Sequence, residues 1–312
     1  MVASDEFDEM RKAALMSRRA FMGGTVAITA AALLGACSDG ERAGNLSLER
    51  ATISYGGDPN QVADLLVPLT DGAVPVVVLV HGGYWKTGFD RRSMQALADG
   101  LGRTGYAVWN IDYRRVGDDG GGWPGTFQDV AAGIDHLVGI AADHQIDLGR
   151  AAIVGHSAGG ELALWGAARQ GLPETEVGAG PKVRFAAAVS LAGVVDLAAS
   201  ATDAASGGPE LRNSVVALLG GSPDQVPERY ALTSPVQRVP LGLPQLLIHG
   251  ALDDQVSVQQ SRNYVQAATA AGDAVRLVEL PAGDHLEVVR TDRPAWRDLV
   301  DWLIERVPIG PG

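Results

Sequence analysis

The fold of this chain is decided by the stretch Gly155-His156-Ser157-Ala158-Gly159, a G-x-S-x-G pentapeptide that joins two different kinds of segment. The apolar run Ala151–Val154 precedes it and predicts a buried strand, while Glu161–Ala168 follows it and predicts a helix. A strand–turn–helix context is typical of a nucleophile elbow, in which a tight turn presents a serine hydroxyl to a base. The sequence therefore predicts Ser157 as a catalytic nucleophile.

Two later loops provide the candidate acid and base for this serine. Asp253 follows an apolar run, and His285 comes shortly after the strand-like run Val275–Leu280. Catalytic groups of parallel sheets gather where the strands end, so we predict Asp253 as the orienting acid and His285 as the base. The neighbouring Asp254 is interpreted as a turn-capping carboxylate. The chain order Ser157, Asp253, His285 is the order expected of an α/β hydrolase.

A glycine pair early in the chain is the candidate oxyanion hole. It lies in His81–Trp85, directly after a strand-like run. Glycines allow backbone N–H groups to approach a ligand without obstruction by a Cβ atom. We predict that the N–H groups of Gly83 and Ala158 bind the oxyanion, with a third donor at Tyr84.

Apolar strand-like runs alternate with helix-like segments after the first fifty residues. This alternation predicts an α/β fold with a mostly parallel central sheet and helices on both faces. The strand-like runs are Ala51–Tyr55, Val62–Pro68, Val76–Val80, Tyr106–Ile111, Ala151–Val154, Phe185–Leu191, Leu246–His249 and Val275–Leu280. The helix-like segments are Ser93–Arg103, Thr126–Ala142, Glu161–Ala168, Ser257–Ala271 and Pro294–Arg306.

The segment 196–239 interrupts the alternation. It is rich in Ser, Gly and Pro and contains one helix-like stretch, Asn213–Leu219. We interpret it as a small cap insertion over the site, and an ordinary long connection is the alternative. Trp85 and Trp123 are candidate substrate-pocket residues, with simple core packing as the alternative for each.

The N-terminus resembles an export signal. Ser17–Met22 contains a twin-arginine pair, and an Ala/Gly/Thr-rich apolar run follows it. The run ends in Leu34-Gly35-Ala36-Cys37, which resembles a bacterial lipobox that ends at the chain's single cysteine. We predict a signal peptide over residues 1–36 and lipidation of Cys37. An uncleaved membrane anchor and a cytosolic protein are the alternatives.

The predicted mature chain begins with a flexible tether over residues 37–48, and the catalytic domain follows over 49–312. A lipid on Cys37 holds the protein at the outer face of the bacterial cytoplasmic membrane, with a secreted or periplasmic soluble form as the alternative. The net charge of −12 and pI of about 4.9 disfavour nucleic acid as a partner. Composition does not give the oligomeric state.

The residues quoted above resemble the α/β-hydrolase superfamily, specifically its hormone-sensitive-lipase-like carboxylesterases and kynurenine formamidases. The resemblance covers roughly Val74–Val307 and implies the α/β-hydrolase fold with a Ser-His-Asp triad and neither metal nor organic cofactor. The chain departs from these families at Glu161, where His or Asn is frequent. The matching residues are His81–Trp85, Asp112–Arg114, Trp123-Pro124, Asp129, Gly155–Gly160, Asp253 and His285.

These features predict a serine hydrolase that cleaves small-molecule carboxylic esters through an acyl-enzyme. The alternative substrate is an amide, N-formylkynurenine, which the same triad can hydrolyse. A non-catalytic lipoprotein that binds a ligand on a hydrolase scaffold is the third hypothesis.

Overall fold

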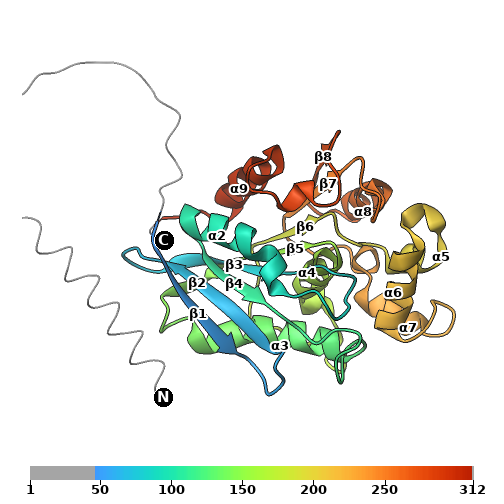
Figure 1. Ribbon diagram of the computed structural model, residues 1–312, viewed down its shortest axis with the longest axis horizontal. Helices are drawn as coiled ribbons and strands as arrows, with labels where there is room; N and C mark the ends of the chain where they lie inside the picture. The colour runs from blue at the N-terminus through green and yellow to red at the C-terminus, as the bar shows by residue number, and fades with distance from the viewer. Residues whose placement is uncertain (1–45, 311–312) are drawn as a thin grey trace, which may run out of the picture. The chain divides into compact units, whose positions relative to one another are not determined.

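The computed structural model describes residues 46–310 (Figure 1). The predicted signal peptide over 1–36, the lipidation site Cys37 and most of the predicted tether lie outside the described residues. The first strand begins at Leu48, and the Ser47 carbonyl accepts a hydrogen bond from the N–H of Leu69. The end of the predicted tether is therefore part of the sheet, a correction of the predicted boundary at residue 48.

Eight strands of the described chain form one sheet in the order β1-β2-β4-β3-β5-β6-β7-β8. The first strand is antiparallel to β2 and β2 is antiparallel to β4, whereas all later neighbours are parallel. The predicted mostly parallel sheet is confirmed. The strands are β1 Leu48–Ser54, β2 Val62–Pro68, β3 Val74–Val80, β4 Ala107–Ile111, β5 Ile146–His156, β6 Ala187–Leu191, β7 Gln245–Gly250 and β8 Val275–Leu280.

Helices cover both faces of this sheet (Figure 1). The α-helices are α2 Gln95–Thr104, α3 Gly125–Ile140, α4 Ala158–Ala168, α5 Leu197–Thr202, α6 Pro209–Leu219, α7 Pro227–Thr233, α8 Val258–Ala270 and α9 Pro294–Arg306. Short 3₁₀ helices are η1 Arg91–Met94, η2 Arg169–Gly171, η3 Ala204–Ser206, η4 Pro235–Gln237 and η5 Glu287–Val289.

The apolar run of β3 explains the two-sided core. Val76, Val78 and Val80 join the cluster that contains α3, α4 and α8, while Val77 and Leu79 join the cluster that contains α2 and α9. Successive side chains of a strand point to opposite faces, so a strand covered on both sides needs apolar residues at every position. This is why the continuous runs in the sequence predicted the strands correctly.

Element boundaries differ from prediction where polar residues or glycines obscure the pattern. β5 begins at Ile146 rather than Ala151, because its first half contains the Asp147–Arg150 ion pair. α4 begins at Ala158 rather than Glu161, because its first turn is Ala-Gly-Gly. The segment 196–239 holds α5, α6 and α7, of which only α6 was foreseen.

Backbone packs directly on backbone around the turn between β5 and α4. A Cβ atom at Gly155 would lie 1.8 Å from the Gly159 carbonyl oxygen, and one at Gly159 would lie 2.1 Å from the Val80 carbonyl oxygen. Neither oxygen can move without displacing its own strand or helix. Glycine is therefore required at both positions for steric reasons, independently of any chemistry at Ser157.

We expect Gly155→Ala to lower the free energy of unfolding by about 3 kcal/mol or more, because the new methyl group overlaps backbone atoms. Gly139 on the exposed face of α3 is the matched control, since a Cβ there meets nothing within 4 Å. Gly139→Ala should stabilise the protein by about 0.5–1 kcal/mol through helix propensity. Urea unfolding measures the free energy of unfolding of both variants. Equal effects of the two substitutions would contradict the close backbone packing at Gly155.

Candidate active site

Ser157 is the single residue between β5 and α4. Its backbone has φ 55° and ψ −121°, a conformation that non-glycine residues rarely adopt. The turn is held by the Ser157 N–H, which donates to the Leu191 carbonyl at 2.8 Å, and by the Ser157 carbonyl, which accepts from Gly160 at 2.8 Å. This strained geometry is the one expected of a nucleophile elbow.

The predicted acid and base are in direct contact. His285 Nδ1 lies 2.7 Å from Asp253 Oδ2, and both side chains are buried. Because a carboxylate accepts hydrogen bonds, Nδ1 carries the proton in this contact and Nε2 is left as the basic nitrogen. The arrangement suits a histidine that removes a proton from an alcohol.

Asp253 is held in its charged form by an extensive set of donors. Its Oδ1 accepts from the N–H groups of Gln255 and Val256, each at 2.9 Å, and its Oδ2 also lies 3.2 Å from His249 Nε2. Burial alone raises the pKa of Asp253, but the hydrogen bonds from His249 and His285 outweigh it and keep the pKa well below its ordinary value.

His249 is a residue whose contact with the acid was not predicted from the sequence. Besides facing Asp253, its Nε2 lies 2.9 Å from the Val256 carbonyl oxygen, and its Nδ1 lies 2.7 Å from Ser261 Oγ. Through these contacts His249 fixes the loop that carries the predicted acid. Its place four residues before Asp253 was the available signal.

His156 brings the base loop against the serine turn. Its ring centroid lies 4.8 Å from that of His285, and its Nε2 lies 3.0 Å from the His285 carbonyl oxygen. Burial, followed by the neighbouring His285, lowers the pKa of His156 to about 3. His156 is therefore neutral near pH 7. Because His156 directly precedes Ser157, its contacts with His285 hold the predicted base next to the serine turn.

The candidate oxyanion loop follows β3 and runs against the same turn. A Cβ atom at Gly82 would lie 2.8 Å from the His156 carbonyl oxygen and 3.0 Å from Ser157 Cβ. Gly83 has φ 110°, and a Cβ there would lie 2.2 Å from Phe89 Cβ. Gly82 is therefore needed for the close approach that places the loop next to the predicted nucleophile, and Gly83 is needed for the packing of the loop on Phe89.

Tyr84 and Trp85 continue the loop in the left-handed region, with φ 57° and φ 54°. Each such residue costs roughly 1–3 kcal/mol and persists only where the surroundings fix it. Tyr84 Oη donates to Gln255 Oε1 at 2.8 Å, which ties this loop to the loop of Asp253. Ala158, predicted with Gly83 as one of the two main donors, is the first residue of α4, where helix N–H groups lack partners within the helix.

Trp85 is a buried core residue, not a pocket residue, which corrects our prediction. Its side chain is fully buried, and its indole N–H donates to Glu161 Oε2 at 3.1 Å. Glu161 is also fully buried, and burial raises its pKa well above the ordinary value of 4.5, with the Trp85 hydrogen bond opposing this only in part.

A buried ionic network around Asp112 contacts the start of the candidate oxyanion loop at His81. His81 Nε2 lies 2.9 Å from Asp112 Oδ1, and His81 Nδ1 lies 2.7 Å from the Gly82 carbonyl oxygen. Arg91 and Arg115 also contact Asp112. Burial raises the pKa of Asp112, but the hydrogen bond and charge of His81 and the two arginines lower it overall.

The segment 196–239 contacts both loops of the site. Lys86 Nζ lies 2.6 Å from Glu210 Oε1 on α6, and Gly207 forms an antiparallel bridge with Val256 in the acid loop. Trp123, the second predicted pocket residue, is half-buried. The backbone N–H of Trp123 donates to the Leu218 carbonyl of α6, and the Trp123 ring packs on the Phe127 ring. These contacts place the segment beside the site.

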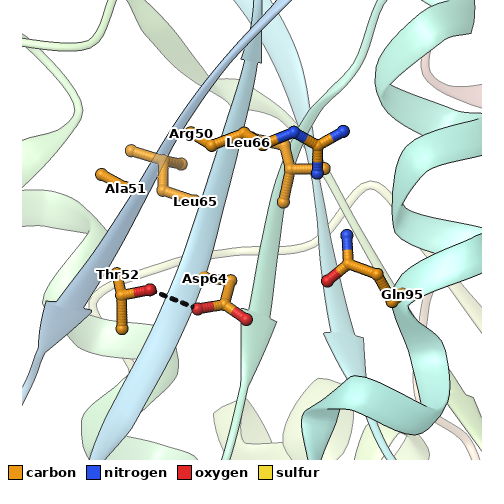
Figure 2. Close-up of a pocket in the computed structure, with 7 residues that line it drawn as sticks. All are labelled: Arg50, Ala51, Thr52, Asp64, Leu65, Leu66 and Gln95. Atoms are coloured by element: carbon orange, nitrogen blue, oxygen red, sulfur yellow. Dashed lines mark hydrogen bonds between the residues drawn. The ribbon is translucent and has the colours of Figure 1, made fainter.

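A hollow of about 280 Å³ opens elsewhere, between β1, β2 and α2 (Figure 2). The charged side chains around it are already paired: Arg50 with Asp99 at 2.8 Å, and Asp64 with Arg91 at 2.8 Å. None of the predicted site residues lines it, and we assign it no role. Its lining residues are Arg50, Ala51, Thr52, Asp64, Leu65, Leu66 and Gln95.

Two searches of the described residues bear on cofactors and membranes. Within residues 46–310, His, Cys, Asp and Glu side chains do not form a group of three that could hold a metal ion. The same part of the chain contains no helix that is both long enough and apolar enough to cross a bilayer.

The sheet order, the strained serine turn and the buried Asp–His contact define the α/β-hydrolase class. A comparison with solved structures agrees: Esterase B from Lactobacillus rhamnosis superposes with a TM-score of 0.70 at 20% identity, covering 98% of this chain and 95% of that one. The BD-FAE family model matches residues 64–267, and the chain belongs to this family. The expected resemblance to α/β-hydrolase carboxylesterases is thus confirmed.

Several named relatives are esterases. Esterase LipC of Mycobacterium tuberculosis is 28% identical over 244 residues, covering 76% of this chain. The chain spans about 60% of the length of that relative. A bifunctional GH43-CE protein of Bacteroides eggerthii superposes with a TM-score of 0.71 at 25% identity, covering 83% of this chain and 35% of that one.

We expect Glu161→Gln to change stability in a pH-dependent way. The pKa of Glu161 is raised in the folded state. As the pH rises above about 4.5, the carboxyl group of Glu161 therefore loses its proton in the unfolded chain before it does so in the folded protein. Deprotonation thus favours the unfolded state, and the wild type loses stability relative to the glutamine variant, which does not titrate. The stability advantage of Glu161→Gln over wild type should therefore grow as the pH rises above about 4.5. Urea unfolding at several pH values tests this, and a constant difference would contradict the raised pKa of Glu161.

Proposed function

We propose that this protein hydrolyses carboxylic esters through a Ser157–His285–Asp253 triad. The observation that carries the proposal is the 2.7 Å contact between His285 Nδ1 and Asp253 Oδ2, in a loop that packs on the residue before the strained Ser157. A histidine with a buried carboxylate behind it and a serine turn beside it has the roles that nucleophilic acyl transfer requires.

In the proposed reaction His285 Nε2 takes the Ser157 hydroxyl proton while the serine oxygen attacks the ester carbonyl carbon. Asp253 stabilises the imidazolium that forms and remains ionised, consistent with its lowered pKa. The imidazolium then gives its proton to the leaving alcohol, and an acyl-enzyme remains. Water, deprotonated by His285, attacks the acyl carbonyl and releases the carboxylic acid and free Ser157.

The oxyanion of each tetrahedral intermediate is assigned to the N–H groups of Gly83 and Ala158, with Tyr84 as a third donor. Each such donor contributes about 3 kcal/mol to transition-state stabilisation. Support comes from the close approach of Gly82 to Ser157 and from the position of Ala158 at the start of α4. The proposed chemistry uses side chains and backbone amides throughout.

Most of the relatives' names favour an ester over an amide as the substrate, although one shorter match is to an uncharacterised peptidase, YtmA of Bacillus subtilis. Esterase LipC and a probable carboxylic ester hydrolase, LipM, both of Mycobacterium tuberculosis, support ester hydrolysis. The GH43-CE protein and a structure titled as a carbohydrate esterase from gut microbiota make acylated sugars one class of ester to assay. N-formylkynurenine belongs in the same assay as the amide alternative.

We expect Ser157→Ala to lower kcat for p-nitrophenyl acetate on the order of 10⁵-fold, because no other side chain replaces the nucleophile. A fluorophosphonate probe should label the wild type and fail to label this variant. Ser214→Ala is the matched control, since Ser214 is a buried serine whose hydroxyl donates within α6 to the Glu210 carbonyl. Persistent labelling of Ser157→Ala would refute the assignment.

We also propose that the chain is exported as a lipoprotein anchored through Cys37, on the twin-arginine pair and lipobox of residues 1–37. Cys37→Ala should abolish incorporation of labelled palmitate and release the protein from the membrane fraction. Globomycin should block processing of the wild type in the same way. An unchanged mature mass in Cys37→Ala would argue against lipidation.

A further inference from the structure

The candidate oxyanion loop adopts a backbone conformation that needs external support. Gly83, Tyr84 and Trp85 have φ values of 110°, 57° and 54°, so three successive residues lie in the left-handed region. Two of them carry side chains that disfavour it. A loop of this kind keeps its shape only where the surrounding structure fixes it. The N–H groups of Gly83 and Tyr84 can point at the proposed oxyanion only while the loop keeps this shape.

Trp85 is the residue through which the loop is fixed. Its side chain is fully buried, its carbonyl accepts from the Val116 N–H at 2.8 Å, and its indole N–H donates to Glu161 Oε2 at 3.1 Å. The hydrogen bond to Glu161 is the one that crosses from the loop to α4.

Glu161 is placed to join the two halves of the proposed oxyanion hole. It lies four residues after Ser157, in the first turn of α4, and its N–H donates to the Ser157 carbonyl at 3.3 Å. The same helix begins with Ala158, another proposed donor. One side chain therefore connects the helix that carries one donor with the loop that carries the others.

The chemistry of Glu161 is unusual for a buried packing residue. Its Oε1 is buried and has no hydrogen-bond partner among the described residues. An apolar residue would avoid this cost, so packing alone does not account for a carboxyl group here. What a carboxyl oxygen adds at this position is an acceptor for the Trp85 indole.

We propose that Glu161 is a positioning residue whose buried carboxyl oxygen holds Trp85, and through it the N–H groups of Gly83 and Tyr84, in the orientation that stabilises the oxyanion. This inference rests on the proposed ester hydrolysis. Burial raises the pKa of Glu161, and its carboxyl oxygen accepts a hydrogen bond in either protonation state.

Three variants separate positioning from packing. Glu161→Gln keeps an acceptor oxygen at the same reach, Glu161→Leu keeps an apolar volume without the acceptor, and Trp85→Phe removes the indole donor. A residue that only fills space is replaced well by leucine, whereas a hydrogen-bond acceptor is replaced well only by glutamine.

For p-nitrophenyl butyrate, we expect Glu161→Leu to lower kcat on the order of 10- to 100-fold with KM within about twofold, because donor alignment acts on the transition state. Glu161→Gln should stay within about threefold of wild type. Trp85→Phe should resemble Glu161→Leu, and the double variant should be no worse than either, since both remove one hydrogen bond. Equal activity of the leucine and glutamine variants, or a loss confined to KM, would overturn the proposal.

Amide hydrogen exchange of residues 82–87 provides a readout that does not depend on activity. Exchange should be faster in Glu161→Leu than in wild type and unchanged in Glu161→Gln, with equal thermal stability of the two variants as the folding control. Unchanged exchange in Glu161→Leu would overturn the positioning role. A wild type that neither turns over esters nor reacts with a fluorophosphonate would instead refute the proposed function, so the two failures are distinguishable.

Discussion

Backbone contact between the β5–α4 turn and the chain that follows β3 is the constraint on which the site depends. Gly159 packs against the Val80 carbonyl, and Gly82 packs against the His156 carbonyl and Ser157 Cβ. Side chains at these glycines would push the segments apart. Because these glycines have no side chains, main-chain atoms set the separation between the serine turn and the candidate oxyanion loop. Main-chain atoms can shift far less than side chains can.

The same constraint explains how much of the molecule was predictable. Strands covered on both faces require unbroken apolar runs, so the central strands such as β3 were visible in the sequence, whereas β1 and β8 at the sheet edges are partly exposed and carry polar residues. The glycines that permit close approach marked the turn at Ser157. The chain order of Ser157, Asp253 and His285 then followed from the rule that functional groups gather at the strand ends.

What could not be predicted concerns pairings between distant segments. Trp85 looked like a pocket aromatic because its sequence neighbours are oxyanion candidates, yet its partner is Glu161, 76 residues later. Only the fold shows that His249 faces Asp253. Short helices α5 and α7 were missed because Ser, Gly and Pro dominate their surroundings and their apolar pattern is brief.

α4 differs from the other helices in being buried on every side, from Ala158 to Ala168. The sheet, α3 and the segment around η4 enclose it. Hardly any position of α4 can accept a bulkier or more polar residue without disturbing a neighbouring residue. We therefore expect sequence differences among relatives to concentrate in the surrounding loops and in α5, α6 and α7, and to be slight along α4.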